Sequence, residues 1–199
     1  MVKPAAKTAT QRFLRRAIAS PLLCGLLAFS LAQPAQAEPP AKGGPRSDAQ
    51  VKAVLLAKFL HYIQWPEQAL PKPGAPISIG FLGSDPVATE MSGLVSGGTY
   101  IVKGRPLALK RSARPTDLLD CQVLFISKSA NANVKAVLAT FQGTGVLTVS
   151  DLDRFSAAGG MIAFRNDGDR IRFEINHAAA RREGLQISAD LCAFADKMK

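Results

Sequence analysis

Three short apolar segments that alternate with helical ones constrain this sequence most strongly. The apolar segments are PISIGFLG (76–83), CQVLFIS (121–127) and GVLTVSD (145–151), and helical patterns at 86–95 and 131–141 lie between them. Alternating strands and helices are typical of a parallel sheet with helices on its faces. The segment 121–127 is apolar on both faces, which predicts a buried central strand.

The last third of the chain predicts an antiparallel hairpin. Residues 161–164 and 170–175 flank the sequence RNDGD, in which Asp167-Gly168 is a hairpin turn signal. In 170–175 (RIRFEI), charged and apolar residues alternate, so that one face of the strand carries the charges. We therefore expect an α/β fold with a single three-layer domain, a mostly parallel sheet and a C-terminal antiparallel hairpin.

Capping residues and helical spacing predict a long first helix. Ser47 or Asp48 begins it, and Pro66 ends it after Trp65. We expect its buried stripe to comprise Val51, Val54, Leu55, Phe59, Tyr62 and Ile63.

Further caps predict the other helices. Asp85 caps a helix that has Pro86 at its first position and runs to about Val95. Asn176 begins a short helix that ends at Gly184, and Ser188 begins the final helix. A short edge strand is expected near 100–102.

The first 37 residues have the pattern of a secretory signal peptide. Five Lys and Arg residues precede an apolar run over 17–31, and residues 35–37 (AQA) match an A-x-A cleavage site. The run is short for a membrane span, which needs ~20 residues, and no later stretch of the sequence supplies one. We expect cleavage near Ala37, Sec rather than twin-arginine export, a flexible leader over 38–46 and a folded domain over 47–199.

Charge gives little support to nucleic-acid binding. The formal net charge of +10 falls to +5 when the five positive residues of the signal peptide are removed. The remaining Lys and Arg residues are spread along the chain, with small clusters such as Arg181-Arg182. A weak attraction to anionic surfaces of the cell envelope remains open.

Motifs for metal binding, cofactors and catalysis are not found in the sequence. His61 and His177, its two histidines, lie far apart and are not joined by other ligands at metal-binding spacing. No nucleotide-binding glycine pattern and no nucleophile elbow occur, so we expect neither a cofactor nor an enzyme. Ser84 and Asp85, at a strand-to-helix turn, form a weak candidate for a ligand or anion site, although a capped turn explains them as well.

Two cysteines remain after cleavage. Cys121 begins a buried strand and Cys192 lies in the final helix. Export places both where disulfides persist, so one bond between them is allowed, and the sequence leaves open whether it forms.

Several motifs together resemble those of the YfiR-like family of exported proteins. They occur from about Gln50 to the end of the chain, in the family's order: VKAVLLAKFLHYIQWP, ISIGFLGSDP, CQVLFIS, VLTVSD, GGMIAF and RFEINHAAARREGLQIS. The resemblance implies a periplasmic α/β protein that binds the periplasmic sensor region of an inner-membrane diguanylate cyclase and represses it. The resemblance further implies that release of the cyclase by an envelope signal raises cyclic di-GMP and favours biofilm.

The resemblance also implies a partner-binding region in the C-terminal hairpin and the helix after it. The residues that match it are Ile162, Phe164, Glu174, Ala180, Arg181 and Arg182. Some relatives carry a cysteine pair where this chain has Ser156 and Ala163, whereas Cys121 matches a common family cysteine whose partner here would be Cys192. A homodimer is also allowed. The alternative function is a small-ligand-binding sensor module that acts on another signalling protein.

Overall fold

The computed structural model describes residues 46–97, 100–130, 133–168 and 170–197, so the expected signal peptide and nearly all of the leader lie outside the described residues. The strands are β1 (Ile63–Gln64), β2 (Ile77–Leu82), β3 (Ile101–Val102), β4 (Arg105–Ser112), β5 (Val123–Ile126), β6 (Leu147–Ser150), β7 (Ile162–Asp167), β8 (Arg170–Ile175) and β9 (Gln186–Ile187). The α-helices are α1 (Asp48–Tyr62), α2 (Pro86–Ser96), α3 (Val134–Thr140), α4 (His177–Arg182) and α5 (Ala189–Lys197). Three 3-10 turns lie at Glu67–Ala69, Pro115–Leu118 and Lys128–Ala130.

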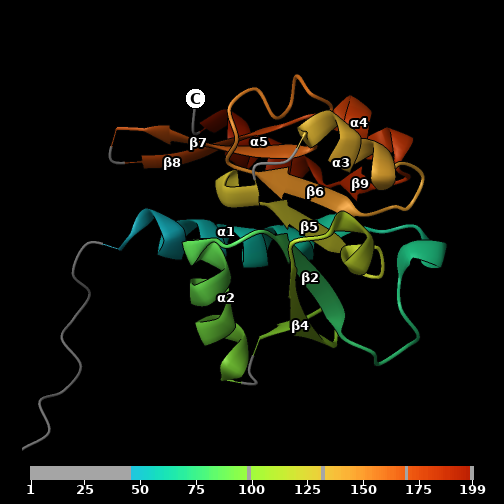
Figure 1. Ribbon diagram of the computed structural model, residues 1–199. Helices are drawn as coiled ribbons and strands as arrows, with labels where there is room; N and C mark the ends of the chain where they lie inside the picture. Colours follow the sequence, from blue (N-terminus) through green and yellow to red (C-terminus); the bar gives the residue numbers. More distant parts are fainter. Residues whose placement is uncertain (1–45, 98–99, 131–132, 169, 198–199) are drawn as a thin grey trace, which may run out of the picture. The chain divides into compact units, whose positions relative to one another are not determined.

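The main sheet has the strand order β3-β4-β2-β5-β6-β7-β8 within the described residues (Figure 1). Strands β4, β2, β5, β6 and β7 run parallel, whereas β3 and β8 are antiparallel to their neighbours at the two edges. The expected single α/β domain, with a mostly parallel sheet and an antiparallel hairpin, is therefore confirmed.

Hydrophobic clusters cover both faces of the sheet. In the central strand β5, Val123 and Phe125 pack into the cluster that contains residues of α1, α2 and α5. Leu124 and Ile126 point to the other face and join the cluster beneath α3. All four positions of β5 are buried, as its uniformly apolar sequence predicts.

Helix α1 ends earlier than the sequence predicts. Ser47 caps it as expected, with its Oγ accepting a hydrogen bond from Gln50 N (3.2 Å), but the helix stops at Tyr62 rather than at Trp65. The next two residues form β1, which pairs antiparallel with β9. This pairing joins segments more than 120 residues apart, and it takes precedence over the local helical pattern.

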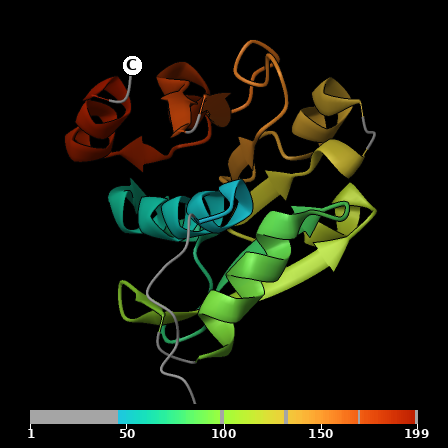
Figure 2. The same cartoon turned by 90° about the vertical axis from the view of Figure 1, so that its left-hand side faces the viewer.

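The buried face of α1 also differs from the expected stripe. Phe59 and Ile63 are buried as predicted, but Tyr62 is exposed and the three other stripe residues are half-buried. The helical residues that are buried are Lys52, Ala53, Leu56, Ala57, Phe59 and Leu60. The buried face thus includes two alanines that the expected stripe left out, and α2 packs against this helix (Figure 2).

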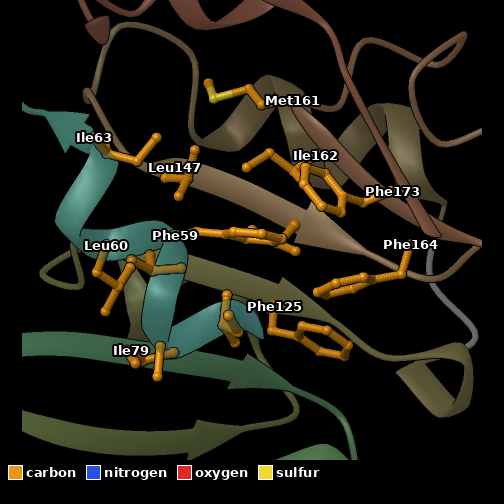
Figure 3. Packing of buried hydrophobic residues seen from close by; sticks show 14 of the residues in the cluster. Phe59, Leu60, Ile63, Ile79, Phe125, Leu147, Met161, Ile162, Phe164 and Phe173 are labelled. Atoms are coloured by element: carbon orange, nitrogen blue, oxygen red, sulfur yellow. The ribbon is translucent and has the colours of Figure 1, made fainter. Parts of the chain in front are cut away.

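Phe59 lies at the centre of the larger core cluster. Its ring stacks on Phe164 of β7 at a centroid distance of 5.6 Å and meets Phe173 of β8 at 4.6 Å (Figure 3). Helix α1 therefore holds the C-terminal hairpin from one face, which determines which hairpin side chains remain accessible.

The caps of the other helices follow the sequence. The Asp85 Oδ1 accepts a hydrogen bond from Val87 N (2.8 Å), and Pro86 begins α2. The Asn176 side chain caps α4 through Ala179 N (3.0 Å). Ser188 Oγ likewise accepts from Leu191 N (3.3 Å) at the start of α5.

Candidate functional site

The apolar residues of the expected partner-binding region lie inside the domain. Ile162, Phe164 and Ala180 are 0%, 2% and 1% exposed, and all three belong to the core cluster around α1. Helix α1 covers the apolar face of the hairpin, which buries Ile162 and Phe164, and Ala180 is buried on α4 in the same cluster, so a direct contact of these three with a partner stays a prediction.

Glu174 remains accessible on the opposite face of the hairpin. Its Oε2 lies 2.6 Å from the Nη2 of Arg165 on β7, and the two side chains are 33% and 62% exposed. Arg172 pairs with Asp167 across the same hairpin. Four charges of this face are thus paired with one another, and such exposed pairs contribute ~0–1 kcal/mol each to stability.

Arg181 and Arg182 are exposed in the last turn of α4. Within the described part of the chain, neither side chain forms a hydrogen bond or an ion pair. Cations at this end of a helix are favoured by the partial negative charge of its last carbonyl groups. Of the six expected partner-binding residues, Glu174, Arg181 and Arg182 are thus those with accessible side chains.

Ser84 and Asp85 lie at the carboxyl end of β2, as expected, but the Ser84 amide and the first turn of α2 already have partners within the domain. Ser84 N donates to Ser129 Oγ (2.8 Å), and the Asp85 carboxylate itself occupies the start of α2 by accepting from Val87 N. An anion bound there would meet that carboxylate. The structure favours the capped turn over an anion site.

A pocket of about 340 Å³ nevertheless opens beside these residues, between α1 and the loops after β2, β5 and β6. Ligands of open α/β sheets commonly bind at the carboxyl ends of strands where the strand order reverses, and here β4 and β5 lie on opposite sides of β2. A second pocket of about 460 Å³ adjoins it, shares Lys128 and Asp151 with it, and extends to Glu174.

A buried ion pair forms one wall of the first pocket. Lys52 Nζ lies 2.7 Å from Asp151 Oδ2, with the two side chains 8% and 12% exposed. Asp151 Oδ1 is buried without a hydrogen-bond partner in the described residues. This pair was not predicted from the sequence, in which the available signal was a lysine within the apolar face of a helix together with an aspartate at a strand end.

Both cysteines are free thiols, so the structure does not contain the disulfide that the sequence left open. Cys121 is buried beneath Gly80 of β2 and Leu118, and burial raises the pKa of its thiol to about 11. Cys192 is half-buried on α5, where its Sγ donates to Ser188 O at 3.1 Å. The environment of Cys121 disfavours a reactive thiolate at neutral pH.

The described residues contain no group of three or more His, Cys, Asp or Glu side chains that could hold a metal ion. His61 is exposed, with its ring 6.1 Å from that of Tyr100, and His177 is exposed at the start of α4. None of the described helices is both long and apolar enough to span a bilayer.

Comparison with known proteins defines the class. The YfiR/HmsC-like family matches residues 49–196, and the chain belongs to this family. The YfiR-like family consists of periplasmic regulators of cyclic di-GMP signalling.

Solved structures support the fold. A conserved domain protein from Vibrio cholerae O1 biovar El Tor is similar, with a TM-score of 0.50 and 12% identity over 74% of this chain. The match spans 58% of that protein. Because the identity is only 12%, the likeness concerns the fold alone. None of the curated proteins compared with the chain matches it.

Proposed function

We propose that this protein binds the periplasmic sensor region of an inner-membrane diguanylate cyclase and represses it. In this proposal, an envelope signal causes the protein to release the cyclase, and the released cyclase raises cyclic di-GMP. The family match over residues 49–196 carries this proposal. The mature chain acts by binding, as a periplasmic partner of the membrane enzyme.

The accessible charges support a binding surface on the C-terminal part of the domain. The Glu174 carboxylate has one oxygen on Arg165 and keeps a third of its side-chain surface exposed. Arg181 and Arg182 are exposed and have no partner in the described residues. Charged groups of this kind set the specificity and the association rate of a complex more than its affinity.

The experiment measures cellular cyclic di-GMP in a strain that lacks the protein. We expect the level to rise, wild-type protein to restore it, and Glu174→Lys to restore it less because the variant reverses an accessible charge. An unchanged level in the deletion strain under several growth conditions would reject repression. The Lys72→Glu variant, at another exposed charge, is the matched control.

A second candidate function is a small-ligand sensor that acts on a signalling partner. The observation that favours it is the pair of pockets at the carboxyl ends of the strands, which share Lys128 and Asp151. Saturable thermal stabilisation of the purified protein by a periplasmic metabolite would support this candidate, and its loss in Lys128→Ala would place the ligand in these pockets.

A further inference from the structure

A groove of about 530 Å³ runs between α3 and α4, which are neighbours in Figure 1. Leu138 of α3 and Ala179 of α4 form its two walls, and Met161, just before β7, lies at its base. Met161 and Ala179 are buried and Leu138 is half-buried. The base of the groove is therefore apolar, and its volume is within the range of sites that hold a ligand or a side chain.

The base of the groove is held by hydrogen bonds. Met161 N donates to Thr148 Oγ1 (3.2 Å), and Met161 O accepts from Asn176 N (2.7 Å). The polar backbone atoms at the base are thus paired within the domain. A partner needs to supply apolar contact there rather than hydrogen bonds.

The rim of the groove is cationic. Lys135 and Arg182 are exposed on opposite helices, and neither side chain forms a hydrogen bond or an ion pair with any residue in the described ranges. Glu183 also lines the groove, but its carboxylate accepts a hydrogen bond from Gly145 N (3.2 Å). Two unpaired cations beside an apolar base favour an acidic occupant with an apolar side chain.

We propose that this α3–α4 groove binds an acidic segment of the partner protein. An apolar side chain of that segment lies on Leu138, Met161 and Ala179, and its carboxylates face Lys135 and Arg182. The inference rests on the proposed function, because it identifies the part of the domain that meets the cyclase. A second copy of this chain fits poorly, since a two-fold interface through the groove brings like charges together.

Two sets of variants, each with its own control, test the groove in the deletion strain. Lys135→Glu and Arg182→Glu reverse the rim charges, whereas Lys72→Glu makes the same change at an exposed lysine that does not line the groove. Ala139→Trp fills the groove from α3, whereas Ala136→Trp adds the same bulk to an exposed position of that helix outside it.

We expect the two charge reversals and Ala139→Trp to leave cyclic di-GMP at the level of the deletion strain. Both control variants should restore the wild-type level, and the melting temperatures of all five variants should stay near that of the wild type. Repression by wild type and by all variants alike would reject the groove while leaving the proposed function intact.

Photo-crosslinking tests binding in the groove independently of repression of the cyclase. A benzophenone amino acid is placed at position 139, and at position 72 as the control. A crosslink from position 139 to an acidic periplasmic segment of a diguanylate cyclase supports the inference. A crosslink to an acidic segment of another envelope protein supports the groove as a binding site but rejects the cyclase as the partner. A crosslink between two copies of the chain, or none from position 139, would overturn the inference whether or not wild-type protein represses the cyclase.

Discussion

Lys52 of α1 and Asp151, the residue after β6, form an ion pair of 2.7 Å in which both side chains are largely removed from solvent. The pair joins the first helix of the domain to the carboxyl end of a central strand. It also separates the core from the pocket beside Ser84.

Replacing one member of this pair should destabilise the domain strongly. Lys52→Met leaves the Asp151 carboxylate buried without its cation, which typically costs about 3–5 kcal/mol. Urea denaturation of the purified protein measures the loss.

The double variant Lys52→Met/Asp151→Leu is the control for this prediction. It removes both charges, so we expect it to recover most of the lost stability. A single variant as stable as wild type would mean that Asp151 is well solvated.

Phe164→Ala should act on folding rather than on a contact with the partner. Phe164 packs on Phe59 in the core, and truncation of a buried phenylalanine costs about 3–5 kcal/mol. Loss of repression by this variant should therefore follow the fraction of unfolded protein. Full stability together with lost repression would restore Phe164 as a contact residue.

Exchange of the charges of Arg165 and Glu174 distinguishes pairing within the hairpin from contact with a partner. The double variant Arg165→Glu/Glu174→Arg keeps an opposite-charge pair, so stability should stay within about 1 kcal/mol of wild type. We expect repression to remain impaired, because a partner meets the charges in exchanged positions. Full recovery of repression would show that the pair serves only the hairpin.

The cysteines should differ in reactivity. At pH 8, iodoacetamide should modify Cys192 in the folded protein and spare Cys121, whose pKa of about 11 and burial keep it a thiol. Mass spectrometry should find both modified after denaturation. Recovery of a Cys121–Cys192 disulfide from freshly purified periplasmic protein would contradict the free thiols of the structure.

The same pKa determines a dependence of stability on pH. The ordinary pKa of the thiol is 9.0, so between pH 9 and 11 the unfolded chain releases the Cys121 proton before the folded one does. The free energy of unfolding should therefore fall across this window. Urea titrations should show a smaller fall for Cys121→Ala than for wild type.

The sequence predicted those parts of the fold that depend on local chemistry. Asp85 with Pro86, and Asn176, begin helices where their capping geometry indicates, and the Asp167-Gly168 turn forms the hairpin. The end of α1 could not be predicted in this way, because the pairing of Ile63 with Ile187 depends on a segment far along the chain.

The candidate site was harder to predict because burial is a property of the assembled domain. Phe164 and Glu174 lie on facing strands of one hairpin, yet α1 covers only the apolar side and leaves the carboxylate accessible. The burial of Lys52 likewise depends on Asp151, which supplies the opposite charge from a segment far along the chain. The burial of Phe164 and the burial of Lys52 cannot be predicted from alternation along a strand or from helical spacing alone.

Repression by binding from the periplasmic side can be measured by adding purified mature protein to spheroplasts of the deletion strain and following cyclic di-GMP over time. If binding represses the cyclase, cyclic di-GMP should fall to the wild-type level in proportion to the wild-type protein bound, whereas Arg182→Glu should leave it at the level of the deletion strain. An unchanged level with protein bound to the membrane would show that binding does not repress the cyclase, and would contradict the account.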